Sequence, residues 1–493
     1  MAKIIDVSKV FPEELNPWER SQIYNGLDTC ICFEVFEVLE PQLDNQTAAT
    51  YAFSRALQGP VLEMKLRGVR IDKQRRAEVL EAYARQLDLL ERNLQVIVGD
   101  GCGVYDFNWG SNPDLHNLFY EVLHLPTVRK RGRATVDRDA LEKLEAYTIA
   151  RPIISHLKAM RDLRKKIGVL KTAIDPDGRI RTSFNIAGTS TGRLSSSASE
   201  FGTGSNLQNV EELLRSVLTA DPGKKMGYFD AEQIQSRIVG AIEWNLFRDG
   251  RYLDACESGD LHTTVAKLCW PKLAWTGVLA QDQELAEQPY YRHYSRRFMC
   301  KKIGHGTNFR GKPYTISQQA HVDIEMIEEF QPNYFKAFPS HEEWHRWVEN
   351  EIHETGIIHS ITGRRRQFWG RRDSDETVRE AIAYDPQSSE SHIVNNGMLQ
   401  VWRERDCDLL LQGHDAVVVQ YPEEREEEIV PKILAQLRYP VPLDHGRQLV
   451  IPYGCMVGWN FGKFDEKSNP DGLIKHKGID KRKRTEEVHI LDR

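Results

Sequence analysis

Two aspartates follow β-forming segments in a way that could place them side by side. Residues 409–420, LLLQGHDAVVVQ, read as a β-hairpin whose tight turn carries the carboxylate of Asp415. In residues 225–237, KMGYFDAEQIQSR, a short strand is predicted to end at Asp230, and a helix to begin at about Gln233. On neighbouring strands of one sheet, the two carboxylates could hold two Mg²⁺ ions about 3.5–4 Å apart, an arrangement that serves phosphoryl transfer.

A third segment supports that chemistry, which is needed because a single aspartate is typical of a turn or a helix cap. The predicted helix 296–311 carries, at intervals of four residues, Arg297, Lys301, His305 and Phe309. On a helix these side chains form one stripe of two cations and two rings. The cations could hold a triphosphate, and each ring that stacks on a base contributes about 1–3 kcal/mol. The alternative interpretation is an amphipathic surface helix.

The elements that must position these residues come from distant parts of the chain. Strand patterns end near Asp230 and return in the C-terminal third, whereas residues 233–350 are predicted to be helical. We therefore expect one sheet with a helical insertion. A long helix is predicted from the N-cap Asp72 to Gly99; fewer than three heptads are present, which favours packing on its own protein over a coiled coil.

Composition limits the class of protein. The chain has 493 residues, enough for two to four lobes, and no apolar run approaches a membrane span or a signal core, so we expect a cytoplasmic protein. Eight cysteines without a CxxC pair support neither a disulfide framework nor a structural zinc. The net charge of −6 hides basic clusters at 161–166, 363–372 and 480–484. Such clusters are usually solvated faces and indicate nucleic acid only if other features do.

Six ordered motifs over about residues 56–462 resemble those of the family A DNA polymerases. GTSTGRLSS…NLQNV (188–210) is similar to the primer-template motif, DAEQIQSR (230–237) to motif A, the helix 296–311 to motif B, and GHDA (413–416) to motif C. TGRRRQF (362–368) and AYDPQSSES (383–391) resemble two further family segments.

The resemblance implies roles for individual residues. Two Mg²⁺ ions would be held by Asp230 and Asp415, which with Arg297 and Lys301 form the catalytic set. The expected nucleotide-binding residues are Gln235, Arg297, Lys301, His305 and Phe309; the expected DNA contacts are Arg193, Asn206, Gln208, Gln387 and His414. The implied partners are primer-template DNA and dNTPs, with a separate exonuclease subunit or a processivity factor as further candidates, and no membrane.

The implied fold is α+β, a right-hand polymerase with a β-sheet palm and mainly helical thumb and fingers. The expected organisation is an exonuclease-domain remnant at 1–55, thumb and connecting segments at 56–180, palm at 181–240, fingers at 241–390, palm again at 391–462, and a charged flexible tail at 463–493.

Four positions depart from the family pattern. Ala416 replaces the motif C glutamate, Gln235 the motif A glutamate that blocks ribonucleotides, Phe309 the motif B tyrosine, and His305 a position normally Phe or Tyr. Because Gln235 and Phe309 both differ, we expect that they changed as a pair.

The N-terminal segment bears on proofreading. YNGLD (24–28) resembles the last motif of the family's 3′–5′ exonuclease, but only 23 residues precede it, so the earlier exonuclease motifs do not fit in this sequence. We expect a template-directed DNA polymerase of phage replication without proofreading in this chain. The alternatives are a repair or gap-filling polymerase and a catalytically silent primer-template binding protein.

Overall fold

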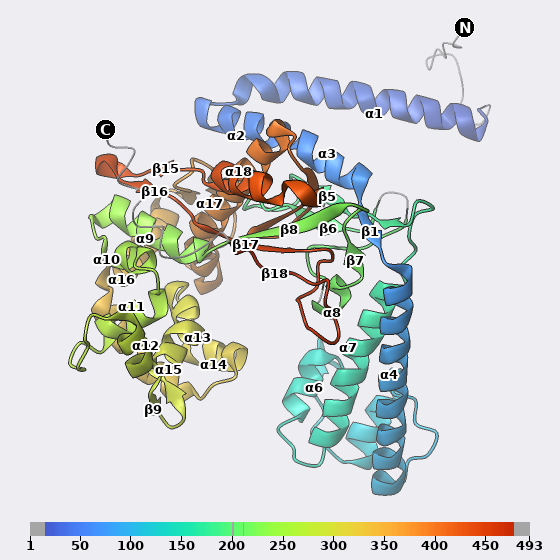
Figure 1. Ribbon diagram of the computed structural model, residues 1–493. Helices are drawn as coiled ribbons and strands as arrows, with labels where there is room; N and C mark the ends of the chain where they lie inside the picture. The colour runs from blue at the N-terminus through green and yellow to red at the C-terminus, as the bar shows by residue number, and fades with distance from the viewer. Residues whose placement is uncertain (1–14, 200–201, 211, 478–493) are drawn as a thin grey trace.

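The site residues are carried by a five-stranded antiparallel sheet built from distant segments. The computed structural model describes residues 15–199, 202–210 and 212–477 (Figure 1). The strand order is β13-β14-β8-β17-β18, all neighbours being antiparallel. The strands are β8 (Lys224–Ala231), β13 (Asp408–Gln412), β14 (Ala416–Pro422), β17 (Tyr453–Gly458) and β18 (Ile474–Lys475). The prediction of one sheet with a helical insertion is confirmed.

The sheet is buried where the chain is richest in β-branched residues. Val417, Val418 and Val419 of β14 are all buried, so both faces of this strand are covered, as expected of a continuous apolar strand. The register pairs Ala416 of β14 with Asp230 of β8. The predicted hairpin with Asp415 at its turn is therefore present.

The insertion between β8 and β13 is mainly helical, as predicted. Its helices are α9 (Ile234–Phe247), α10 (Arg251–Glu257), α11 (Leu261–Cys269), α12 (Leu279–Glu287), α13 (Arg296–Asn308), α14 (Pro313–Ala320), α15 (Ile324–Ala337), α16 (Pro339–Glu354) and α17 (Asp375–Glu404). Two short hairpins interrupt them, β9 (Pro289–Tyr291) with β10 (Tyr294–Ser295), and β11 (Ile357–His359) with β12 (Arg365–Gln367). The helix predicted to reach residue 311 ends at Asn308, because Arg310 takes a left-handed backbone conformation with φ 56°.

A second helical lobe has a hydrophobic core of its own. Its elements are α4 (Lys73–Cys102), α5 (Asn112–His116), the π-helical η3 (Asn117–Val122), the strands β2 (Arg129–Lys130) and β3 (Arg133–Ala134), α6 (Arg138–Leu144) and α7 (Arg151–Lys171). Asp72 caps α4 by accepting a hydrogen bond from the Arg75 N–H at 2.9 Å. α4 packs along α7 (Figure 1), and this core runs from Leu94 to Met160. The predicted long helix does pack on its own protein.

The remaining elements frame these parts. They are α2 (Asn45–Ala56), α3 (Gln58–Arg67), β1 (Val69–Ile71), β4 (Arg179–Ile180), β5 (Ser183–Asn185), β6 (Ser195–Ser197), α8 (Glu212–Arg215), β7 (Leu218–Thr219), α18 (Glu426–Leu437), β15 (Val441–Pro442), β16 (Gln448–Leu449) and the short 3₁₀ turns η2 (Glu40–Gln42), η4 (Glu423–Arg425) and η5 (Asp444–Gly446). Strands β4, β1 and β7 form a small antiparallel sheet between the second lobe and the main sheet.

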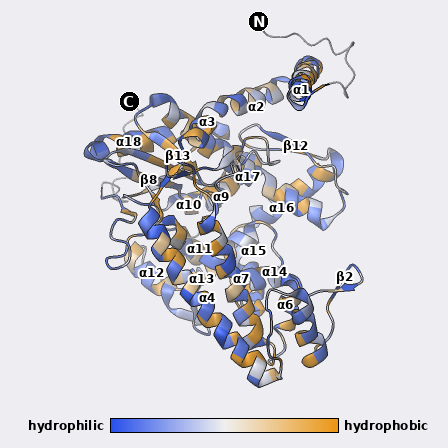
Figure 2. Ribbon diagram, turned by 90° about the vertical axis from the view of Figure 1, so that its right-hand side faces the viewer, coloured by the Kyte–Doolittle hydropathy of each residue, from blue (hydrophilic) through white to orange (hydrophobic). Residues whose placement is uncertain are grey.

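Helix α1 (Pro17–Leu39) lies at the outside of the molecule and has no buried residue. Figures 1 and 2 show it at the edge of the structure, with hydrophobic residues among its hydrophilic ones. Trp18, Tyr24, Phe33 and Val38 are each at least 60 % exposed, which is unusual for apolar side chains of this size.

The predicted flexible tail at 463–493 is wrong for its first part. Residues 463–477 fold back on the sheet: β18 pairs with β17, and Leu473 and His476 are buried. Apolar contacts and strand pairing outweigh the polar composition that suggested a mobile segment. Residues 478–493, which include the basic cluster 480–484, lie outside the described residues, as do residues 1–14 of the predicted exonuclease-domain remnant. No helix in the described ranges has the length and apolar character to cross a membrane.

Candidate active site on the sheet

Asp230 and Asp415 lie on adjacent strands at the same edge of the sheet. Asp230 is the penultimate residue of β8, and Asp415 immediately precedes β14. The Ala231 N–H donates to the Asp415 carbonyl oxygen at 2.9 Å, which fixes the two strand ends together. The two carboxylates that the sequence predicted to meet are thus held on neighbouring strands.

Asp230 is flanked by small residues, and the negative charges near it outweigh the positive charge of Arg215. Its register partners are Ala416 on β14 and Gly454 on β17, two small residues. Burial and the neighbouring Asp415 charge raise the pKa of Asp230 to about 6, although the Tyr228 hydroxyl donates to it at 3.0 Å. No ion pair joins either aspartate to a cation within the described part of the chain.

The carboxylates of Asp230 and Asp415 fit a divalent cation that prefers oxygen ligands. Mg²⁺ prefers carboxylate oxygens and usually takes one or two of them from the protein. Asp230 and Asp415 supply two carboxylates of like charge, and a cation bound between them would remove the repulsion that raises the Asp230 pKa. Ala416 adds no third carboxylate where the family pattern has a glutamate.

Beside the aspartates is a buried ionic network that sequence reasoning missed. Glu390, in the middle of α17, forms an ion pair with Arg193 and accepts hydrogen bonds from the Gln235 amide at 3.2 and 3.3 Å. Its side chain is 3 % exposed, and burial raises its pKa while Arg193 lowers it. A single glutamate in a predicted helix is usually interpreted as part of a solvated surface. Only Gln235, which departs from the family pattern, could have pointed to this network.

Of the predicted DNA contacts, Gln208 and His414 lie at the hairpin. The Gln208 amide donates to the Gln412 side chain at 3.0 Å, which places it beside the turn that carries the exposed His414. The exposed Asn206 side chain accepts from the Gln208 N–H at 3.0 Å, forming a local turn. Gln387 is half-buried on α17, one helical turn before Glu390.

The stripe on α13 stands apart from the aspartates. Arg297 is paired with Asp260 at 3.3 Å and with Glu287 at 3.0 Å, whereas Lys301 is exposed and has no ion pair among the described residues. The His305 and Phe309 rings pack edge to face at 5.0 Å between centroids. No hydrogen bond or ion pair in the described ranges links this stripe to Asp230 or Asp415.

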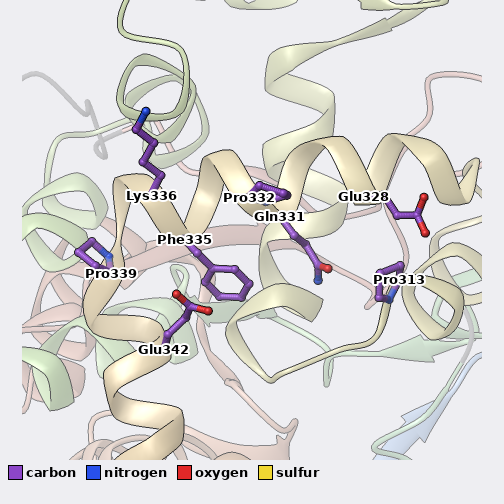
Figure 3. Close-up of a pocket in the computed structure, with 8 residues that line it drawn as sticks. All are labelled: Pro313, Glu328, Gln331, Pro332, Phe335, Lys336, Pro339 and Glu342. Carbon is purple, nitrogen blue, oxygen red and sulfur yellow. The ribbon is translucent and has the colours of Figure 1, made fainter.

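A surface groove of about 700 Å³ lies elsewhere, among α14, α15 and α16 (Figure 3). It is lined by side chains such as Gln331 and Phe335, and by none of the residues predicted to act. The two aspartates lie at the edge of the sheet and the cationic stripe lies on α13, so the predicted chemistry lies outside this groove.

Comparison with known proteins gives one family and one fold. Residues 73–458 match the family model "DNA polymerase family A". The thermostable DNA polymerase I of Thermus filiformis is 27 % identical over 441 residues, covering 83 % of this chain and 48 % of that protein; the corresponding enzyme of Thermus aquaticus is 27 % identical over 421 residues, covering 79 % and 46 %. The chain thus spans about half the length of these relatives.

A solved structure agrees with the model in fold. The POL domain of Pol1 from M. smegmatis, in complex with DNA primer-template and dNTP, superposes with a TM-score of 0.66 at 24 % identity, covering 82 % of this chain and 69 % of that one. The predicted α+β fold class is confirmed.

Proposed function

This chain belongs to DNA polymerase family A, and from that membership we propose that it extends a DNA primer by template-directed addition of dNTPs. The observation that carries the proposal is the pairing of Asp230 with Asp415 on adjacent strands, where neither aspartate forms an ion pair with a cation of the described residues. A catalytically silent binding protein would have no need to keep two like charges together at a cost in free energy.

The site residues have different proposed roles. Asp230 and Asp415 would hold Mg²⁺, which when bound lowers the pKa of a primer 3′-hydroxyl and stabilises charge on the leaving pyrophosphate. Lys301 and Arg297 bind the triphosphate, and Arg297 exchanges its carboxylate partners for phosphate oxygens. His305 and Phe309 offer rings for the base, while Gln208 and His414 lie where the primer end would approach Asp415.

Primer extension tests this proposal. The purified chain, given Mg²⁺, a labelled primer-template and dNTPs, should add nucleotides in template order, and rNTPs should be poor substrates. Asp415→Asn is the matched control, since it keeps the shape of the side chain and removes its charge. Binding of primer-template without any extension would instead support the silent binding protein.

The proposed role is replication without proofreading by this chain, in the phage setting that the resemblance suggests. Tyr24 and Asp28 lie on α1, where no residue is buried. Within the described ranges, the one set of three potential metal ligands that come close together, Glu426, Glu427 and His476, does not include Asp28. Incubation of labelled single-stranded DNA with Mg²⁺ should leave it intact. Steady shortening that Asp28→Ala abolishes would contradict this part.

A separate exonuclease subunit or a processivity factor would be a partner of this chain, and α1 is the surface we propose for it. Exposed apolar residues such as Phe33 and Val38 favour association with another protein. Phe33→Glu should therefore leave primer extension on short templates unchanged and reduce any stimulation by such a partner. Loss of extension on short templates would assign α1 to the polymerase itself.

A further inference from the structure

Three side chains from three separate elements meet at Glu390. Arg193 comes from the loop between β5 and β6, Gln235 from the first turn of α9, and Glu390 from α17. Because the three segments are far apart in sequence, the network joins distant parts of the chain. A buried carboxylate is costly unless it is paired and hydrogen-bonded, and both conditions are met here.

The network fixes which way the Gln235 amide faces. The ion pair with Arg193 favours the ionised form of Glu390. An ionised carboxylate can only accept hydrogen bonds. The Gln235 NH₂ group must therefore point at Glu390, as the 3.2 and 3.3 Å distances show. It follows that the carbonyl oxygen of Gln235 is turned away from Glu390.

The network also lies beside the two aspartates. Gln235 lies in the first turn of α9, five residues after Asp230 at the end of β8, and the charge of Asp415 acts on Glu390. The Gln235 amide donates its hydrogen bonds to Glu390. The Phe309 ring packs against His305 and cannot form a hydrogen bond with Gln235. The pairing of Gln235 with Phe309 that the sequence suggested stays a prediction.

We propose that Glu390 is a positioning residue for sugar selection: it holds the Gln235 side chain in one orientation, with the amide carbonyl presented to the sugar of the incoming nucleotide. The inference rests on the proposed polymerase function. A glutamine held in place excludes a 2′-hydroxyl by its bulk, whereas one that is free to turn makes room for it. In this arrangement the carboxylate at 390 accepts a hydrogen bond from the amide at 235. The two residue types should therefore be interchangeable, with an amide at 390 and a carboxylate at 235.

The test measures kcat and KM for dATP and rATP with the full chain carrying Glu390→Gln, Gln235→Glu, or both. Gln235→Glu places two carboxylates against one guanidinium and should lower kcat/KM for dATP by about 10- to 100-fold, a coupling typical of residues in contact. The double variant restores one carboxylate and one amide and should recover to within about threefold of wild type. Glu390→Gln alone should lower the preference for dATP over rATP by about tenfold.

Two further variants separate positioning from loss of structure. Gln235→Leu keeps the Arg193–Glu390 ion pair and should also weaken sugar preference, even if Glu390→Gln folds poorly. Asp385→Asn, which removes another buried carboxylate from α17, is the matched control and should leave sugar preference unchanged. Unchanged preference in both Glu390→Gln and Gln235→Leu, or a double variant no better than the weaker single one, would overturn the inference. Absence of extension by wild type would instead refute the polymerase function.

Discussion

The carboxylates of the sheet and those of α17 have opposite surroundings. Asp230 and Asp415 sit at strand ends next to small residues and repel one another. On α17, Glu390 has Arg193, and the buried Asp385 accepts from the Ser389 hydroxyl at 2.8 Å and from the Ile361 N–H at 2.9 Å. Two carboxylates that repel one another are suited to an exchangeable cation. A carboxylate with an ion pair or with several hydrogen bonds can instead orient other groups or hold the fold together.

Removing a sheet carboxylate should have the largest effect. Asp230→Asn or Asp415→Asn should lower kcat for primer extension by at least about 10³-fold, because a lost metal ligand removes several kcal/mol of transition-state stabilisation. Affinity for primer-template should change little, since neither side chain is assigned to DNA. Single-turnover extension and DNA binding at fixed salt measure the two quantities; extension within a few-fold of wild type would refute the metal site.

Shortening Gln235 should have the next largest effect. Gln235→Ala removes the bulk that we propose meets the sugar and should reduce the preference for dATP over rATP by about 10- to 200-fold, the range of a small steric difference in a pocket. The kcat/KM ratio of the two nucleotides measures it. Gln208→Ala, which alters an amide on the other side of the hairpin, serves as the control and should leave the ratio unchanged.

The two cations of α13 differ in the same way. Arg297 has two carboxylate partners, whereas Lys301 has none among the described residues. Lys301→Ala should raise the KM for dNTP or lower kcat by about 10- to 100-fold, the worth of one charge-assisted hydrogen bond, without loss of thermal stability. Arg297→Ala should act on the same constants and also lower Tm, because it leaves the buried Asp260 without its cation. An equal loss of affinity for DNA in either variant would reassign the helix to duplex binding.

The sequence was most informative where local patterns and packing agree. The hairpin before and after Asp415, the strand that ends near Asp230, and the helix capped by Asp72 each have a strong local signal, and the structure contains all three. Strand alternation, turn residues and caps act within a few residues of each other, so they can be identified without knowing the fold.

The parts that the sequence did not predict depend on contacts between distant segments. Glu390 joins Arg193 and Gln235 across the fold, and nothing near it in the sequence marks it as buried. Residues 463–477 are polar, yet strand pairing with β17 orders them. The end of α13 at Asn308 is set by the left-handed Arg310, an arginine that no local rule places there.

The smallest effect should come from Asp385, and it should appear in stability and not in activity. Burial raises the pKa of Asp385 to about 7, although Ser389 and Ile361 donate to it. Its pKa in the unfolded chain is near the ordinary value for aspartate, about 3.9. As pH falls through 7, the folded state therefore takes up a proton that the unfolded state does not yet bind, and this group makes the protein more stable toward pH 5.

Asp385→Asn should remove that dependence. At pH 8 the variant avoids burying a charge that forms no ion pair in the described part of the chain. Because Ile361 N–H and the Ser389 hydroxyl both donate to Oδ1, the carbonyl oxygen of the asparagine can still accept from both. We expect its free energy of unfolding to exceed that of wild type by about 1–2 kcal/mol at pH 8, and the difference to shrink toward pH 5. Denaturant unfolding at both pH values measures it. Glu390→Gln provides the contrast, because it leaves the half-buried Arg193 without its counter-charge and should destabilise the fold at pH 8. If both variants shifted stability in the same direction at pH 8, the distinction between a carboxylate paired with a cation and one held by neutral donors would not hold on this helix.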